Sequence, residues 1–225
     1  MIIAIDGPSG SGKSSTARAV ARVLHALFID TGAMYRAVAL FLTRAGFTDA
    51  RAVRSVDLTG LAIDLVPHDD GLRIMLGDED VSDRIREEDM SRQSSVFSSN
   101  PFVREELVAQ QRAIAERWQH KGHHVVMEGR DIGTVVFPQA EFKFFMTADP
   151  RVRAERRTRE LAQRGQSVDV EDVLHDMTNR DRRDSEREHS PLRRADDAIV
   201  VDSSAMAFED QVDHIIRIVS GNEQV

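Results

Sequence analysis

A glycine-rich segment near the start of the chain constrains its fold more than any other sequence feature. Residues 7–14 read Gly-Pro-Ser-Gly-Ser-Gly-Lys-Ser, and they follow the apolar run of residues 2–5 after a single aspartate, Asp6. Behind the segment, apolar residues recur at the spacing of one helical face, at Ala17, Val20, Ala21 and Leu24. A short buried strand, a loop of this spacing and a helix together predict a phosphate-binding loop. The alternative is a glycine- and serine-rich turn that only begins a helix. Such a turn would not need the preceding strand or the full spacing of the loop.

Each part of this loop has a chemical role. The glycines let the backbone approach a polyphosphate closely, so that N–H groups and the helix N-terminus point at the anion. Lys13 can reach the β- and γ-phosphates, and the hydroxyl of Ser14 can ligate Mg²⁺. We therefore expect a nucleoside triphosphate with Mg²⁺ as ligand, contacted by Gly7, Pro8, Ser9, Gly10, Ser11, Gly12, Lys13, Ser14 and Ser15.

The composition limits the remaining possibilities. At 225 residues, the chain has the length of one sizeable domain, or of a domain that carries an inserted subdomain. Its net charge of −8 argues against a general nucleic-acid binder. It contains no cysteine, which excludes disulfides, thiolate metal sites and cysteine nucleophiles and fits a reducing cytoplasm.

The sequence predicts neither a membrane span nor a signal peptide. No apolar stretch approaches the length of a membrane span, and the N-terminus lacks the basic segment of a signal peptide. We therefore expect a cytoplasmic protein without membrane or nucleic-acid partners, and its size favours a monomer. Only Lys13, Lys121 and Lys143 are lysines, so arginine is common and a single arginine is weak support for a site.

Apolar strands alternate with amphipathic helices along most of the chain, which predicts an α/β fold with a parallel sheet. Strands are expected at residues 27–29, 124–127, 142–146 and 199–201. Helices are expected to carry Met34, Val38, Phe41, Leu42 and Ala45 on one face, and, after Asn100-Pro101, to carry Val103, Leu107, Ile114 and Trp118. Further helices are expected at residues 151–165, 170–188 and 208–219.

Residues 60–83 interrupt this alternation. Ile63 and Leu65, then Leu72, Ile74 and Leu76, alternate with other residues around a turn at residues 67–71. This period of two around a turn predicts a β-hairpin. Periodicity alone does not decide whether the hairpin is a unit inserted into the parallel core or an ordinary surface excursion.

Phosphate-binding loops occur in switch GTPases, motor ATPases and small-molecule kinases, and the loop alone does not distinguish these classes. The chain has no Asn-Lys-x-Asp signature for guanine. It is short for a motor ATPase, although residues 125–128 (Val-Val-Met-Glu) loosely match the acidic strand of such proteins. A compact kinase that holds two phosphorylated molecules is therefore favoured.

Two segments after predicted strands have the composition of anion sites. Residues 31–36 (Thr-Gly-Ala-Met-Tyr-Arg) lie at the edge where open α/β sheets bind ligands. In residues 128–134 (Glu-Gly-Arg-Asp-Ile-Gly-Thr), glycines on both sides of Arg130 and Asp131 allow a ligand to approach closely. Taken alone, Arg36 would be a solvated helix arginine, and the second segment would be a tight surface turn.

A third candidate lies in the charged segment 180–187. Spacings of i, i+3, i+4 and i+7 place four of its residues on one helical face: Arg180, Arg183, Asp184 and Arg187. A solvated helix with i,i+4 ion pairs would explain the same pattern. Three arginines on one face favour a bound phosphate, because they repel one another without an anion.

Together these motifs closely resemble the bacterial cytidylate kinases. The resemblance is carried by residues 3–15, 30–36, 129–138 and 180–184, and it continues through residues 190–192 to residues 195–198. The segments keep the order of the family and span nearly the whole chain. The phosphate-binding loop is shared by many families, whereas the second and third segments are specific to this one.

The resemblance implies the three-layer α/β fold of phosphate-loop NTPases, with a parallel sheet, a helical lid and an inserted small β-containing subdomain that binds the nucleoside monophosphate. Within a single kinase unit of residues 1–225, the core would occupy about 1–60, 100–150 and 190–225. The monophosphate-binding insert would occupy about 60–99, and the lid region about 151–189. Such an insert would account for the predicted hairpin.

The resemblance also implies positions for the acceptor. The ligands of its phosphate would be Arg36, Arg130 and Arg187. The cytosine edge would be read by Ser95, Arg104 and Asp131, and the ribose would be contacted by Arg180 and Asp184. Ser95 is placed by its distance from Arg104 within a serine-rich stretch. Thr31 stands where many members of the family have serine, so the hydroxyl contact is expected to survive.

For the donor, the resemblance places arginines where the lid begins. Arg153, Arg156 and Arg157 would meet the ATP phosphates or stack on adenine. The expected catalytic set is Lys13, Arg36, Arg130 and Arg187. Asp30 or Glu128 would orient the waters of the Mg²⁺ held by Ser14.

The implied reaction is the Mg²⁺-dependent transfer of the γ-phosphoryl group of ATP to CMP, and to dCMP. The acceptor phosphate has a second pKa of about 6, so its oxygen is already anionic near neutral pH and no general base is needed. Two alternatives stay open. One is another small phosphate-loop kinase with a different acceptor, and the other is a nucleotide-binding switch protein without an acceptor.

Overall fold

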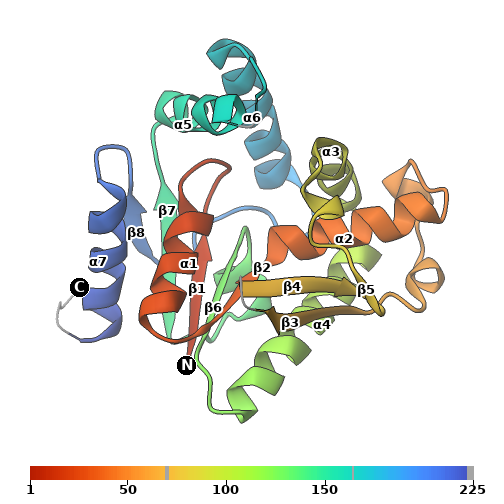
Figure 1. Cartoon of the computed structure of the whole chain (residues 1–225), viewed down its shortest axis with the longest axis horizontal. Helices are drawn as coiled ribbons and strands as arrows, with labels where there is room; N and C mark the ends of the chain where they lie inside the picture. Colours follow the sequence, from red (N-terminus) through yellow and green to blue (C-terminus); the bar gives the residue numbers. More distant parts are fainter. Residues whose placement is uncertain (69–70, 164, 222–225) are drawn as a thin grey trace. The chain divides into compact units, whose positions relative to one another are not determined.

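The chain folds into two compact units. The computed structural model describes residues 1–68, 71–163 and 165–221. Unit 1 comprises Met1–Ile29 and His123–Val225, and unit 2 comprises Asp30–Gly122. Figure 1 shows the helices and strands of both units. The boundaries expected for core, insert and lid stay predictions.

The described strands of unit 1 form a five-stranded sheet (Figure 1). Its order is β2 (Leu27–Asp30), β6 (Val125–Gly129), β1 (Ile2–Asp6), β7 (Phe142–Thr147) and β8 (Ile199–Asp202). β1 pairs in parallel with β6 and β7, and β7 pairs in parallel with β8. The predicted α/β fold with a central parallel sheet is confirmed.

One face of this sheet is covered by α1 (Lys13–Val23) and α7 (Phe208–Val219), which contact each other (Figure 1). Ile3 and Ile5 of β1 pack there with apolar residues from the neighbouring strands and from both helices: Val126, Phe144, Met146, Val201, Ala17, Val20, Ala21, Val212, Ile215 and Ile218. This core anchors the loop between β1 and α1 at both of its ends.

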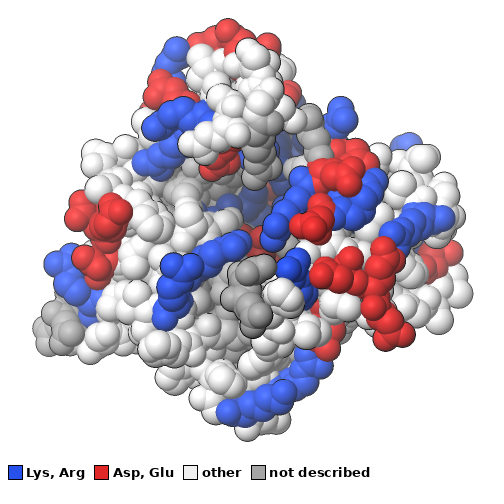
Figure 2. Space-filling model, viewed as in Figure 1, with Lys and Arg blue, Asp and Glu red and all other residues white. Residues whose placement is uncertain are grey.

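The two charged helices of unit 1 are α5 (Pro150–Gln163) and α6 (Val170–Glu186). They pack together through a small apolar cluster of Ala154, Val173 and Met177. Figure 2 shows acidic and basic side chains mixed over these helices. Several of them pair, as Arg151 does with Glu171 at 2.9 Å, so the charge here is balanced rather than uniformly basic.

Unit 2 combines helices with a small antiparallel sheet. Its helices are α2 (Thr31–Arg44), α3 (Glu88–Phe97) and α4 (Pro101–His120), with short 3₁₀ segments η1 (Ala50–Ala52), η2 (Ser55–Leu58) and η3 (Arg84–Arg86). Its described strands are β3 (Ile63–His68), β4 (Gly71–Leu76) and β5 (Glu79–Asp80). α2 contacts α3, α4 and β4.

The predicted hairpin is confirmed. β3 and β4 pair antiparallel, with Ile63 opposite Leu76 and Leu65 opposite Ile74. Two residues of the predicted turn, Asp69 and Asp70, lie outside the described residues. The short strand β5 and the helix α3 were not predicted, because a two-residue strand and a serine-rich helix leave no clear periodicity.

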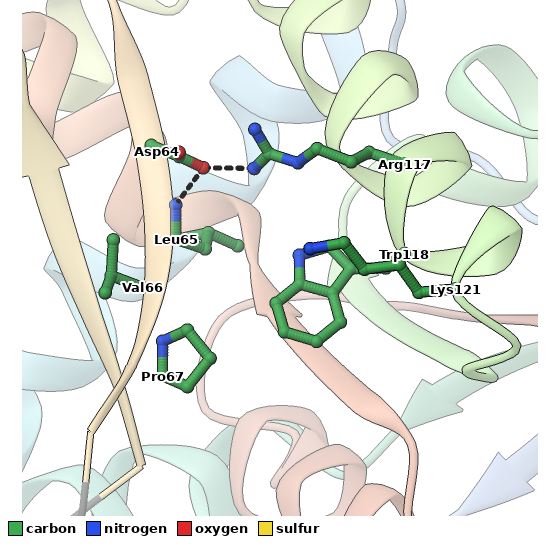
Figure 3. Close-up of a pocket in the computed structure, with 7 residues that line it drawn as sticks. All are labelled: Asp64, Leu65, Val66, Pro67, Arg117, Trp118 and Lys121. Atoms are coloured by element: carbon green, nitrogen blue, oxygen red, sulfur yellow. Dashed lines mark hydrogen bonds and ion pairs between the residues drawn. The ribbon is translucent and has the colours of Figure 1, made fainter.

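Two residues expected on buried helix faces are more exposed than the spacing suggested. Ala45 follows the end of α2 and is exposed. Trp118 is only partly buried and lines a pocket of about 270 Å³ between β3 and the end of α4, where its ring faces Pro67 (Figure 3). Lys121 lies over the Trp118 ring at 5.0 Å, and Asp64 pairs with Arg117. This pocket contains none of the predicted site residues.

No helix within the described residues is both long enough and apolar enough to cross a membrane.

Asn100 is the polar residue on which α4 depends, so its replacement tests the fold of unit 2. Its Oδ1 accepts from the N–H of Val103 at 3.1 Å, and its Nδ2 donates to the carbonyls of Ala50 at 2.7 Å and Val53 at 3.1 Å. Asn100→Ala removes the cap and leaves two carbonyls without this donor, so we expect the free energy of unfolding in urea to fall by about 3 kcal/mol. The control Ser99→Ala, at an exposed neighbour, should change it by less than about 0.5 kcal/mol. Equal effects of the two variants would contradict this account.

Candidate functional site

The glycine-rich segment forms a tight loop between β1 and α1. Gly7 has φ of 154°, and a Cβ there would lie 2.1 Å from the carbonyl oxygen of Met146, so only glycine fits. Gly12 is the N-cap of α1. Among the described residues, no side chain caps this helix and its first turn holds no acid, so its N-terminus keeps the positive end of its dipole for an anion.

Lys13 and Ser14 meet a buried carboxylate at the end of β6. The Nζ of Lys13 donates to the carbonyl of Pro8 at 3.2 Å and lies 3.9 Å from Oε2 of Glu128. The hydroxyl of Ser14 donates to Oε1 of Glu128 at 2.6 Å. A hydroxyl beside a carboxylate is a set of hard oxygen donors of the kind that Mg²⁺ prefers, so these two residues fit the expected metal.

A second buried acid, Asp6, ends β1 directly before the loop. It is 5% exposed, and its carboxylate accepts from the N–H groups of Ile132 at 2.8 Å and Gly133 at 2.7 Å. These residues begin a π-helical turn, η4 (Ile132–Val136), that follows Arg130 and Asp131. Asp6 thereby joins the phosphate-binding loop to the segment that follows β6.

Burial dominates the titration of Asp6. It raises the pKa of the carboxyl to about 7, since the two N–H donors only partly offset the loss of hydration and the charge of Asp131 opposes ionisation further. Sequence reasoning missed Asp6. The sequence feature that could have indicated it is its position at the end of a strand predicted to be buried.

Residues 128–134 are not a surface turn. Glu128, Asp131, Ile132 and Gly133 are all buried. Because Asp6 and Gly129 are register partners of neighbouring parallel strands, the loops that follow β1 and β6 leave the sheet side by side.

Arg130 and Asp184 form the centre of a charged cluster in unit 1. The Nε of Arg130 donates to Oδ2 of Asp184 at 3.0 Å, and Arg187 lies 3.8 Å from Asp184 and 3.9 Å from Asp131. Burial alone would lower the pKa of Arg130, but the carboxylates of Asp184 and Glu128 outweigh it and raise that pKa. Burial alone would raise the pKa of Asp184, but Arg130, Arg187 and Arg180 lower it. Arg130 and Asp184 therefore both stay charged at neutral pH.

The expected face of four residues on one helix is wrong for Arg187. α6 ends at Glu186, and Arg187 is its extended C-cap, whose Nε donates to the carbonyl of Ser190 at 2.5 Å. Arg183 is exposed and donates to the carbonyl of Asn179 in its own helix. The arginine that completes the cluster is instead Arg130, 54 positions earlier in the chain.

The three arginines at the start of the expected lid have different partners. Arg156 donates to the hydroxyl of Ser203 at 3.0 Å and to its carbonyl at 2.6 Å, and Arg157 pairs with Glu160 at 3.0 Å. Arg153 is 7% exposed and is held by the carboxylate of Asp181 and by the loop carbonyl of Ser9. Neither Asp181 nor Ser203 was identified from the sequence.

Unit 2 carries its own candidate residues at the start of α2. Asp30 caps the helix by accepting from the N–H of Ala33 at 2.8 Å, and its other oxygen lies 3.4 Å from Nη2 of Arg36. The Nε of Arg36 is buried and has no hydrogen-bond partner among the described residues. Thr31, in the first turn, is buried. A guanidinium with an unpaired buried N–H is suited to an anion.

Arg104 and Ser95 are brought near each other through Ser98. Nη1 of Arg104 donates to the carbonyl of Ser98 at 3.2 Å, and the hydroxyl of Ser98 donates to the carbonyl of Ser95 at 3.2 Å. The guanidinium of Arg104 also lies over the Tyr35 ring at 5.4 Å. Arg104 is thus held in one orientation from two sides.

The parallel sheet, the phosphate-binding loop and the charged cluster beside it define a phosphate-loop enzyme of the small-molecule kinase class. Comparison with known proteins narrows this class. The cytidylate kinase family model matches residues 3–221, and the chain belongs to this family.

Curated relatives cover almost the whole chain. The cytidylate kinase of Salinibacter ruber is 44% identical over 223 residues, which is 99% of this chain and 98% of that protein. The cytidylate kinase of Pelotomaculum thermopropionicum is 46% identical over 230 residues, with 99% and 97% covered. An uncharacterized protein from Eubacterium ventriosum has a solved structure that aligns with a TM-score of 0.53 at 12% identity, covering 98% of both chains, and shares the fold.

The raised pKa of Asp6 predicts a pH dependence of stability. Well below its ordinary pKa of 3.8, this carboxyl is protonated in both states. Between pH 4 and 7 the unfolded chain ionises while the folded protein keeps the proton, so stability falls as the pH rises. The total loss expected for a rise from the ordinary value of 3.8 to about 7 is about 4 kcal/mol.

Asp6→Asn removes this titration and keeps an oxygen for one of the two N–H groups. Urea unfolding of both proteins at pH 4.5, 6 and 8 should show the wild type losing stability relative to the variant as the pH rises. Parallel profiles across this range would show that Asp6 does not titrate near 7.

Proposed function

We propose that this protein transfers the γ-phosphoryl group of ATP to CMP, and to dCMP, giving the nucleoside diphosphate and ADP. The observation that carries the proposal is the pairing of β1 with β6. This pairing sets the loop of Lys13 and Ser14 beside the segment of Arg130 and Asp131. A phosphate cradle next to a partly buried arginine and a buried aspartate suits a reaction between two phosphorylated molecules.

The donor is assigned to the loop of residues 7–15. Its backbone N–H groups, the N-terminus of α1 and the ammonium of Lys13 hold the β- and γ-phosphates. When bound, Mg²⁺ would be held by the hydroxyl of Ser14 with Glu128 beside it, and it would neutralise charge on the phosphates. Arg156 and Arg157 are both partly buried, and both are assigned to the donor. Arg156 would act from its position on Ser203, and Arg157 from its pair with Glu160.

The acceptor phosphate is assigned to Arg130, Arg187 and Arg36, the positions that the resemblance to the family gives. Each of these guanidiniums is already placed by a carboxylate, Asp184 for the first two and Asp30 for the third. Such fixed cations stabilise the charge that spreads over the moving phosphoryl group without reorganising during the reaction. Since the phosphate oxygen is already anionic, the site needs no general base.

Recognition of cytidine is assigned to Asp131, Arg104 and Ser95 for the base, and to Arg180 and Asp184 for the ribose. A buried carboxylate such as Asp131 accepts from the exocyclic amine of cytosine, which uracil lacks. Thr31 contributes a buried hydroxyl at the start of α2. We further propose that the enzyme is a monomer and that it is cytoplasmic.

An acceptor panel tests the proposal. ADP release is coupled to NADH oxidation, with CMP, dCMP, UMP and AMP compared side by side at the same ATP and Mg²⁺ concentrations. CMP and dCMP should be the fastest acceptors. Faster turnover with another monophosphate would favour a different small kinase, and ATP hydrolysis that no monophosphate stimulates would favour a switch protein.

Asp131→Ala tests the reading of the base. We expect discrimination between CMP and UMP, as the ratio of kcat/KM values, to fall by about a hundredfold, because a site that hydrogen-bonds a substrate group rejects the analogue that lacks it. ATP binding, measured by calorimetry, should change by less than about twofold. Equal kcat/KM values for CMP and UMP in the unmodified protein would remove the basis of this assignment.

Arg130→Ala and Arg36→Ala test the acceptor-phosphate site. Loss of one preorganised charge should lower kcat by about a hundredfold, or about 3 kcal/mol of transition-state stabilisation. Arg183→Ala, an exposed arginine of α6, and Arg44→Ala, at the far end of α2, are matched controls and should stay within about twofold. A loss of less than tenfold in the site variants would place the acceptor phosphate elsewhere.

A further inference from the structure

The phosphate-binding loop is held by a side chain that the proposed reaction does not use. Asp181, in the penultimate turn of α6, is 172 positions from Ser9. Its Oδ1 accepts from the backbone N–H of Ser9 at 3.0 Å. Its Oδ2 accepts from Nη1 of Arg153 at 2.5 Å. The side chain of Asp181 is 16% exposed and that of Arg153 is 8% exposed, so water competes weakly for these bonds.

Arg153 closes the arrangement from the other side. The same Nη1 donates to the carbonyl of Ser9 at 2.8 Å, and its Nε donates to the carbonyl of Ala148, just before α5, at 3.1 Å. The backbone N–H and the backbone carbonyl of Ser9 are thus both bound by side chains, one from α6 and one from α5. Charge-assisted bonds of this length are among the stronger hydrogen bonds in proteins.

The apolar parts of the two helices press on the next residue of the loop. A Cβ at Gly10 would lie 2.5 Å from Cε of Met177 and 3.3 Å from the Cβ of Arg153. Met177 lies one turn before Asp181 on α6 and belongs to the cluster that joins α5 to α6. The loop is therefore fixed at Ser9 by charge and at Gly10 by packing.

An aspartate this close to a phosphate site is unfavourable unless its charge is balanced. Arg153 supplies the balance, so that Asp181 can bind the Ser9 N–H without repelling the donor. We propose that Asp181 is a positioning residue that, together with Arg153, holds the Ser9 peptide in place and keeps the phosphate-binding loop in its donor-binding conformation. The ligand concerned is the triphosphate of a nucleotide, and the inference rests on the proposed function for its identity as ATP.

The test compares donor and acceptor binding in the full-length protein. Asp181→Ala should raise the Kd for Mg·ATP in calorimetry, and the KM for ATP, by about tenfold, while the KM for CMP stays within about twofold. Asp181→Asn keeps an oxygen for the Ser9 N–H and should weaken ATP binding by only about threefold. Asp176→Ala, at an exposed aspartate of the same helix, is the matched control and should bind ATP as the wild type does.

A double-mutant cycle tests whether Asp181 and Arg153 act together. Arg153→Ala alone should weaken ATP binding about tenfold, and the double variant should also be weakened about tenfold rather than about a hundredfold, since both changes remove the same support. Circular dichroism checks that each variant is folded. If Asp181→Ala does not fold, Asp181→Asn carries the comparison.

Three results would overturn the inference: ATP binding within twofold of the wild type in both Asp181 variants, a KM for CMP that rises as much as the KM for ATP, or an additive cycle. The proposed function fails separately. If ATP binding depends on Asp181 but CMP is not turned over, only the proposed acceptor is refuted. If CMP is turned over but ATP binding does not depend on Asp181, only this inference is refuted.

Discussion

The parallel pairing of β1 with β6 is the constraint on which the rest of the site depends. Parallel strands end at the same edge of a sheet, so the loop after Asp6 and the segment after Gly129 leave it side by side. Glu128 can then reach Ser14, and Asp6 can accept from Ile132 and Gly133. A sheet with a different strand order would separate the phosphate loop from the arginine–aspartate pair.

Four buried or partly buried carboxyl groups hold much of unit 1 in place. Glu128 meets Ser14 and Lys13, Asp6 holds η4, Asp184 holds Arg130, and Asp181 holds Ser9. A buried carboxyl group is costly unless it is paired or hydrogen-bonded, so each acid fixes its partner firmly. The result is a set of cations and N–H groups held in place before any anionic ligand arrives.

The phosphate-binding loop thus depends on more than its own glycines. At its start, the backbone at Gly7 packs against Met146, and at its end Ser14 donates to Glu128. In its middle, Asp181 and Arg153 bind the backbone of Ser9, and Met177 packs against Gly10. Substitutions in α5 or α6 can therefore alter binding of the donor without touching it. The expected lid arginines illustrate this. Arg153 is buried and supports the loop itself, while Arg157 is more exposed than Arg153.

The sequence by itself determined the features that depend on local order. These are the strand, loop and helix around Lys13, the hairpin of unit 2, the parallel α/β class, and the motifs by which the family was recognised. Tertiary structure alone decided the partners of the charged groups. Arg130 meets Asp184 across 54 positions, Ile132 meets Asp6 across 126, and Ser9 meets Asp181 across 172. Helical spacing pointed to Arg183 and a helical Arg187 because periodicity reports only neighbours within one element, and it cannot show where a helix stops or which distant residue completes a buried ion pair.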